Sequence, residues 1–215
     1  MKPLYEQYRP ATWADYVGQD KAVAKVDVLR RRGLAGRAYW ISGPSGTGKT
    51  TMALLIAAEL ADPFYIQELD AGALTVAQLR DWEYESHLGA PGKGGRVFVV
   101  NEAHGLRRDV VRQLLVTLEA TRMPAHVAWI FTTTTDGMSL FEEAQEEAHP
   151  LLSRCTVIPL TSQGLSKVFG ERAKAIAEAE NLDGQPVEKY IRLVSDCKNN
   201  MRMALQKIEE GVMLK

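Results

Sequence analysis

One glycine-rich segment constrains the fold of this chain more than any other part of its sequence. It reads Gly43-Pro44-Ser45-Gly46-Thr47-Gly48-Lys49-Thr50 and follows the pattern G-x-x-x-x-G-K-[ST]. Its glycines let consecutive backbone N–H groups turn inward around phosphates, and a helix N-terminus behind them adds a positive dipole. Lys49 supplies a charge for the β- and γ-phosphates of a nucleotide, and the Thr50 hydroxyl is a ligand for Mg²⁺. The segment predicts a site for ATP or ADP with Mg²⁺; the alternative is a plain glycine-rich turn.

Strand-like and helix-like segments alternate on both sides of this loop. We expect strands at 37–42, 64–69, 96–100, 127–131 and 155–160. We expect helices at 20–32, 50–60, 76–86 and 106–120. Such alternation is typical of an α/β fold with a central parallel sheet and right-handed crossovers. The loop thus lies between a predicted strand and a predicted helix, which is the context that the pattern requires.

The pattern changes after residue 160, where only helices are predicted. They are expected at 162–180, 185–196 and 199–213. We therefore predict a nucleotide-binding domain at 1–160 and a small helical domain at 161–215. A piece as short as the second buries little core unaided, so it should pack against the first.

Composition excludes several classes of protein. The chain has 215 residues, of which 46% are hydrophobic and 25% charged, and these ordinary values exclude wholesale disorder. A net charge of −1 provides no overall basic field, so any contact with nucleic acid must come from a local patch. No stretch approaches the roughly 18 apolar residues of a membrane span, and the N-terminus lacks the apolar core of a signal peptide. We therefore expect a cytoplasmic protein without a membrane partner.

An acidic motif follows the predicted strand at 96–100. Asn101 and Glu102 come directly after the apolar run Val97-Phe98-Val99-Val100. Nucleotide hydrolases usually have an Asp-Glu pair here: the Asp holds Mg²⁺, often through water, and the Glu activates the attacking water. Asn101 keeps a carbonyl acceptor for a metal site but lacks the charge, so we expect lower Mg²⁺ affinity and reduced turnover. The alternative is that Asn101 and Glu102 only end a buried strand.

Further stretches, taken in order with these motifs, make the chain similar to the clamp-loader branch of the AAA+ ATPases, especially bacterial gamma/tau-type subunits. The stretches are Tyr8-Arg9-Pro10, Val17-Gly18-Gln19, Glu68-Leu69-Asp70-Ala71, Asn101-Glu102-Ala103-His104-Gly105-Leu106, Thr132-Thr133-Thr134-Thr135-Asp136, Ser153-Arg154-Cys155 and Asn200-Met201-Arg202-Met203-Ala204-Leu205. The phosphate loop is highly specific by itself, whereas the other stretches narrow the branch by occurring together. The resemblance covers nearly the whole chain. It implies an AAA+ three-layer domain followed by a helical lid.

The resemblance also implies which residues contact the nucleotide. The N-terminal stretch would surround the adenine and ribose, the loop would hold the phosphates, and the lid helix would close over them. The implied set is Tyr8, Arg9, Pro10, Val17, Gly18, the loop from Gly43 to Thr50 with the adjoining Thr51, Met201 and Arg202. Thr50 and Asn101 are the implied metal residues.

Roles in hydrolysis follow from the same resemblance. Glu102 would activate water, beside Lys49 on the phosphates. Thr134 or Thr135 would hydrogen-bond the attacking water or the γ-phosphate. Arg202 would reach the γ-phosphate of its own subunit, whereas Arg154 would act as an arginine finger in a neighbour's site. For both arginines the alternative is an ordinary surface position.

Three features depart from the family. The sequence ends at Lys215, just after the expected lid, where clamp-loader subunits continue into a helical collar. The segment 60–64 is too short for the four-cysteine zinc module of gamma/tau-type subunits. The segment 136–150 is longer than expected and carries acidic but no basic residues, which favours a solvated acidic helix over a docking surface.

The implied partners are other clamp-loader-type subunits in a ring or spiral, a sliding clamp, and DNA. Arg107 and Arg108 are candidates for contacts with DNA phosphates. The leading hypothesis is an ATP-hydrolysing subunit that loads a sliding clamp on primed DNA during replication. One alternative is a nucleotide-binding scaffold or regulatory protein whose hydrolysis is weak because of Asn101. The other is a DNA-remodelling AAA+ motor.

Overall fold

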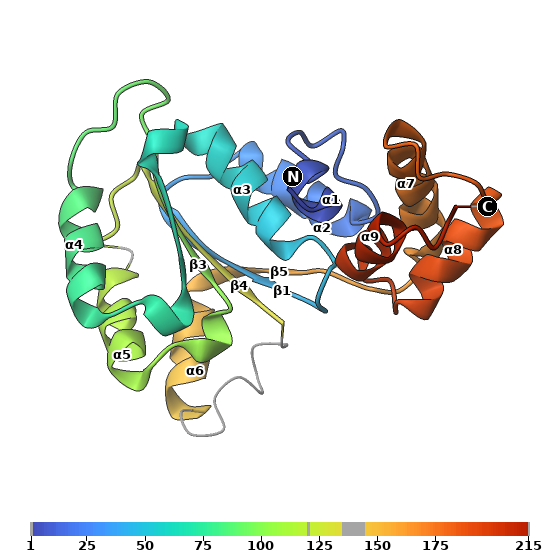
Figure 1. The fold of residues 1–215 in the computed structure, drawn as a ribbon. Coiled ribbons are helices and arrows are strands. Elements are labelled where there is room, and N and C mark those ends of the chain that lie inside the picture. The colour runs from blue at the N-terminus through green and yellow to red at the C-terminus, as the bar shows by residue number, and fades with distance from the viewer. Residues whose placement is uncertain (1, 120, 135–144, 215) are drawn as a thin grey trace.

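The computed structural model describes residues 2–119, 121–134 and 145–214. Within these ranges the strands form a five-stranded sheet in the order β2-β3-β4-β1-β5, and every neighbouring pair is parallel (Figure 1). The strands are β1 (Arg37–Ser42), β2 (Ile66–Asp70), β3 (Arg96–Asn101), β4 (Val127–Thr133) and β5 (Cys155–Pro159). The predicted α/β fold with a central parallel sheet is confirmed.

Helices cover both faces of the sheet (Figure 1). One apolar cluster joins the odd-numbered residues of β3, such as Val97 and Val99, to α2 (Asp20–Arg30) and α3 (Lys49–Leu60). The other joins Phe98 and Val100 to α4 (Val76–Ser86), α5 (Arg108–Thr117) and α6 (Gln145–Ser153). Because successive side chains of a strand point to opposite faces, one continuous apolar run supplies both clusters. The result is a three-layer arrangement.

Several expected elements differ from the structure in their bounds. Phe64 and Tyr65 belong to a short 3-10 turn, Pro63–Tyr65, so β2 begins only at Ile66. The turn begins at Pro63, whose fixed φ suits the first position of a helical turn, and it leaves Phe64 85% exposed. The helix expected at 106–120 is shorter, and residues 135–144 of the acidic segment lie outside the described residues. A short helix, α1 (Leu4–Gln7), was not predicted.

After β5 the described chain is helical, with α7 (Ser166–Ala179), α8 (Val187–Asp196) and α9 (Met201–Glu209). These helices share a third apolar cluster, which also takes in Leu4 of α1. In Figure 1 they lie beside the end of the sheet where β1 runs into α3, and α1 lies next to α9. The division into domains at residue 161 stays a prediction, because the N-terminal segment packs with the C-terminal helices. No helix in the described ranges combines the length and apolar character needed to cross a bilayer.

Candidate nucleotide-binding site

The glycine-rich loop connects β1 to α3 at the carboxyl end of the sheet. Gly46 has a φ of 74° and Gly48 a φ of 99°, both in the left-handed region that favours glycine. A Cβ on Gly46 would lie 2.0 Å from Asn200 Oδ1, and one on Gly48 would lie 2.8 Å from the Tyr16 ring. The N-terminus of α3 follows at Lys49, so its unpaired N–H groups face the loop. This geometry fits an anion and explains why the pattern specifies glycine.

The N-terminal segment holds the loop in place. The Tyr16 hydroxyl donates to the carbonyl of Gly48 at 3.2 Å. Gln19 Nε2 donates to the carbonyls of Thr47 at 3.3 Å and Thr161 at 2.8 Å, while the Thr161 N–H donates back to Gln19 Oε1. Gln19 is only 3% exposed, so these bonds are shielded from water. One side chain therefore ties the loop to the start of the segment that leads into the C-terminal helices.

Lys49 is buried at the base of the loop, and its Nζ donates to the carbonyl of Pro44 at 2.9 Å. Burial lowers the pKa of Lys49, the carboxylate of Glu102 opposes that shift, and the charge of Arg202 adds to it. Lys49 on the sheet side and Arg202 on the helical side are therefore two cations that repel each other. Anionic phosphates bound between them would offset both the desolvation of Lys49 and this repulsion.

Asn101, at the end of β3, is a centre of hydrogen bonds. Its Oδ1 accepts from Thr132 Oγ1 at 2.8 Å and from Thr50 Oγ1 at 3.2 Å. Its Nδ2 donates to Glu68 Oε1 at 2.5 Å. The pair predicted to serve the metal, Thr50 and Asn101, is thus brought together, with oxygen atoms of the kind that Mg²⁺ prefers. The network links Asn101 to three neighbouring elements, α3, β2 and β4.

Glu102 follows Asn101 in a left-handed conformation, with a φ of 50° and a ψ of 48°. This conformation is uncommon for a residue with a side chain and is found often at functional sites. Its side chain is 51% exposed, and its carboxylate lies 3.4 Å from His104 Nδ1, which also approaches Thr133 Oγ1 at 3.4 Å. Glu102 thus faces the pocket rather than the core.

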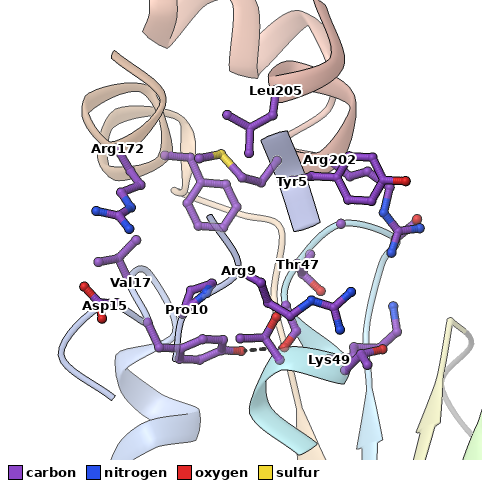
Figure 2. A pocket seen from close by; sticks show the side chains of 18 of the residues that line it. Tyr5, Arg9, Pro10, Asp15, Val17, Thr47, Lys49, Arg172, Arg202 and Leu205 are labelled. Atoms are coloured by element: carbon purple, nitrogen blue, oxygen red, sulfur yellow. Dashed lines mark hydrogen bonds between the residues drawn. The ribbon is translucent and has the colours of Figure 1, made fainter. Parts of the chain in front are cut away.

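A pocket lies between the loop and the C-terminal helices, and Figure 2 shows it from close by. Its lining residues are Tyr5, Arg9, Pro10, Asp15, Tyr16, Val17, Ser45, Gly46, Thr47, Gly48, Lys49, Thr50, Thr51, Glu102, Phe169, Arg172, Met201, Arg202 and Leu205. In Figure 2 the guanidinium of Arg9 points toward Lys49, and the ring of Tyr5 lies beside Arg202. The predicted N-terminal, loop and lid residues thus meet around one cavity.

Some predicted nucleotide contacts lie outside this lining. The Tyr8 hydroxyl donates to Glu180 Oε1 at 2.6 Å, and that bond raises the pKa of Tyr8. Gly18 packs against Leu165 and Phe169, and Gly43 and Pro44 form the base of the loop. These four residues shape the walls rather than line the cavity.

The predicted threonines belong to a run that begins in β4. Thr134 directly follows β4, and Thr135 lies outside the described residues. In the described part of this run, Thr132 donates to Asn101 and Thr133 approaches His104. The predicted role of Thr134 or Thr135 at the γ-phosphate stays a prediction. The strand register, which aligns Thr132 with Ile41 and Thr133 with Ser42, places the earlier two threonines at the end of β4.

Six residues of the lining were not predicted. They are Tyr5, Asp15, Tyr16, Phe169, Arg172 and Leu205. Leu205 had a sequence signal, because a residue four positions after Met201 lies on the same helix face. Tyr5 and Arg172 had none, because they are far apart in the sequence and meet only where α1 and α7 pack into one cluster. The Arg202 guanidinium lies 5.3 Å from the centre of the Tyr5 ring, a cation–π contact that places the arginine at the mouth of the pocket.

Arg154 lies at the amino-terminal ends of the strands, opposite to the carboxyl ends where the glycine-rich loop lies. It directly precedes β5, whose first residue, Cys155, pairs with Ala38 at the start of β1, whereas the loop follows the end of β1. Its guanidinium donates to the carbonyl of Pro150 at 3.0 Å and to Glu119. Arg154 therefore cannot serve the pocket of its own chain.

Of the two candidates for DNA contact, Arg107 is exposed and donates to the carbonyl of Leu74 at 3.3 Å.

Curated relatives include replication proteins. The chain is 32% identical to the DNA polymerase III subunit gamma/tau of Mycobacterium tuberculosis over 159 residues, which is 61% of this chain and 27% of that protein. It is 27% identical to replication factor C subunit 4 of Oryza sativa over 218 residues, which is 98% of this chain and 61% of that protein. The chain thus spans less than two thirds of the length of either relative. These relatives confirm the resemblance to the clamp-loader family.

Solved structures and a family model agree on the fold. A structure of Thermotoga maritima RuvB, described as a Holliday junction branch migration motor, superposes with a TM-score of 0.68 over 94% of this chain and 64% of that one, at 21% identity. A point mutant of the same protein gives a TM-score of 0.72 over 94% of this chain and 65% of that one, at 20% identity. The model described as the Holliday junction DNA helicase RuvB P-loop domain matches residues 8–133. Since that match spans more than half of the sequence, the chain belongs to the family of the RuvB P-loop domain.

Proposed function

We propose that this chain is an ATP-binding and ATP-hydrolysing subunit of clamp-loader type, which acts in DNA replication by helping to load a sliding clamp on primed DNA. The observation that carries the proposal is the pocket itself. A glycine-rich anion-binding loop faces Arg202 across one cavity, with Glu102 at its side. The similarity to DNA polymerase III gamma/tau and replication factor C subunits supports the choice of clamp loading among AAA+ functions.

The lining residues suggest how a nucleotide would be held. The N–H groups at the start of α3 and the Lys49 ammonium would bind the phosphates. Pro10, Val17 and Phe169 offer apolar surface to an adenine ring. Arg202, carried by α9, would contact the terminal phosphate, so that loss of this phosphate would change the position of the C-terminal helices. Glu102 would orient the attacking water.

Magnesium is the expected cofactor. Thr50 and Asn101 would hold it, and their hydrogen-bonded oxygens match the preference of a hard cation. When bound, Mg²⁺ neutralises charge on the phosphates as they are transferred. Because Asn101 brings no charge of its own, this chain should require more Mg²⁺ than an enzyme in which an aspartate holds that position without a second carboxylate beside it.

The position of Arg154 supports assembly with neighbouring subunits. It lies at the start of β5, away from its own pocket, where it would meet the pocket of an adjacent subunit in a ring or spiral. An arginine supplied in this way stabilises charge in the transition state. The proposed partners are therefore other clamp-loader-type subunits, a sliding clamp and DNA, in the cytoplasm.

Steady-state ATPase assays test the proposal, with the purified chain alone, with primed DNA, and with primed DNA and the sliding clamp of the same source. We expect turnover to rise in the presence of DNA and clamp, and Arg154→Ala to abolish the rise while ADP binding stays unchanged. If the purified chain binds neither ATP nor ADP in the presence of Mg²⁺, the proposal is contradicted, because every part of it depends on nucleotide binding.

Two other functions each have an observation in their favour. The matched RuvB domain family favours a DNA-remodelling motor. Asn101 favours a nucleotide-binding scaffold with weak hydrolysis. Capture of a sliding clamp by the chain distinguishes clamp loading from the motor. A turnover that stays low with every DNA and clamp combination would favour the scaffold.

A further inference from the structure

A carboxylate that the proposed function does not use lies against Asn101. Glu68, on β2, accepts a hydrogen bond from Asn101 Nδ2 at 2.5 Å, across the β2–β3 strand pair. Asn101 is 9% exposed, so the contact is largely shielded on its side, whereas Glu68 is exposed toward solvent. A hydrogen bond to a carboxylate in such surroundings is stronger than one between neutral groups.

This contact dictates which way the amide of Asn101 faces. A carboxylate oxygen only accepts hydrogen bonds, so the NH₂ group of the amide must be the side that faces Glu68. The carbonyl oxygen is then left on the other side, where Thr50 and Thr132 donate to it. Without Glu68, the amide could turn over and present its NH₂ group to Thr50, which would repel a cation.

The same contact explains why an asparagine fits at this position. An aspartate would bring two carboxylates within hydrogen-bond distance of each other, and their like charges would repel. With asparagine the pair carries a single negative charge, located on Glu68 rather than on residue 101. The total charge is therefore the same as for an aspartate beside a neutral neighbour.

We propose that Glu68 is a positioning residue for the Mg²⁺ site: it turns the Asn101 amide so that the carbonyl oxygen faces Thr50, and the Asn101–Glu68 pair takes the place of the usual aspartate. This inference rests on the proposed function, because it concerns the metal that accompanies the nucleotide. A purely structural role, in which the contact only ties β2 to β3, would change stability but not the dependence on Mg²⁺.

The test measures how much Mg²⁺ strengthens nucleotide binding. A fluorescent ADP analogue is titrated with wild type, Glu68→Gln and Glu68→Ala, each in excess MgCl₂ and in EDTA. We expect Glu68→Ala to reduce the gain from Mg²⁺ about tenfold, the range known for residues that orient metal ligands. Glu68→Gln should cause a smaller loss, because its amide still offers an acceptor. Affinity in EDTA should not change.

The matched control is Glu188→Gln, which removes one exposed carboxylate from the first turn of α8, far from the site. It should leave both affinities unchanged. Melting temperatures without nucleotide show whether each variant folds. If Glu68→Ala is unfolded, the gain in affinity from Mg²⁺ measured with Glu68→Gln still tests the inference. An unchanged gain from Mg²⁺ in folded Glu68 variants would overturn the inference.

A double variant tests the charge argument separately. Asn101→Asp alone should not raise the Mg²⁺-dependent affinity, because its new carboxylate meets that of Glu68. Asn101→Asp combined with Glu68→Gln should raise it about tenfold above wild type, since the charge then moves to the metal side. An equal gain with and without Glu68→Gln would contradict the pairing. Wild type that binds no nucleotide in either buffer would instead refute the proposed function, and this inference with it.

Discussion

The two walls of the pocket are built in different ways. The wall on the sheet side is Glu102 together with one continuous segment, from Ser45 to Thr51, whose shape follows from glycines with positive φ and the helix that begins at Lys49. The wall on the helical side combines Tyr5 with Arg172 and Arg202, from opposite ends of the chain. The first wall is formed locally, whereas the second exists only when α1, α7 and α9 pack together.

The walls also differ in how they hold their cations. Lys49 is buried, and burial lowers its pKa, so the apo protein carries an unfavourable charge there. Arg202 lies on the Tyr5 ring and keeps contact with solvent. The buried cation has no carboxylate within hydrogen-bond distance in the described chain, and a phosphate would be its first anionic partner. We therefore expect the sheet-side wall to supply most of the affinity.

The largest expected effect is on that wall. Lys49→Ala should weaken ADP binding about 100-fold, because it removes a charged hydrogen-bond donor from a shielded site. The free protein should not lose stability, since the buried charge is costly. Calorimetric titration with ADP and a thermal melt measure the two quantities. Lys189→Ala, at an exposed position on α8, is the matched control and should change neither.

On the helical wall the expected effect is smaller. Arg202→Ala should weaken binding of a non-hydrolysable ATP analogue about tenfold, because an exposed cation is partly screened by water. Binding of ADP should change less, since the arginine is expected to contact the terminal phosphate. Arg192→Ala, also exposed, is the control. Equal losses for Lys49→Ala and Arg202→Ala would show that the two walls do not differ as we infer.

A third change tests the contact between the walls. Gly46→Ala should lower the melting temperature by about 3–6 °C, because it adds left-handed strain and forces Asn200 away. Gly33→Ala is the matched control: Gly33 has a φ of 90° and no atom within 4 Å of the added Cβ, so it carries the strain without the clash. If both variants melt at the same temperature, the contact between the loop and the helical wall does not contribute to stability.

The smallest expected effect lies inside the helical wall, at a distance from the pocket. Asp183 accepts from Tyr190 on α8 at 2.8 Å and from Lys174 on α7 at 3.0 Å, and these bonds lower its pKa. Asp183→Asn should lower the melting temperature at pH 7 by about 1–2 °C, as is usual for charged pairs near the surface.

The pH dependence of that difference has a definite sign. A carboxyl with a lowered pKa in the folded state stabilises the protein above its ordinary pKa, and this contribution is lost as the pH falls. The gap between wild type and Asp183→Asn should therefore shrink as the pH falls below the ordinary value of 3.8 and vanish below the lowered one. A gap that widens on acidification would contradict the assignment.

Much of the fold was predictable because its elements are short-range patterns. β1 and α4 were predicted with the bounds that the structure has, since each is a clear apolar or amphipathic segment between turn residues. The errors occurred where a local signal was overridden. Phe64 and Tyr65 are good strand residues, yet the turn that begins at Pro63 excludes them from β2. The experiments above test the predicted roles of the site residues.

The sequence by itself determined the loop, the strands that carry it and the acidic motif, because glycine conformation, apolar alternation and helix ends act within a few residues. Only the tertiary structure decided that Tyr5 meets Arg202 and that Glu68 meets Asn101. Such contacts depend on how whole elements pack and on strand register, and neither is encoded in any single stretch. The positions of the helical wall and of the amide beside the metal site are consequences of the folded core.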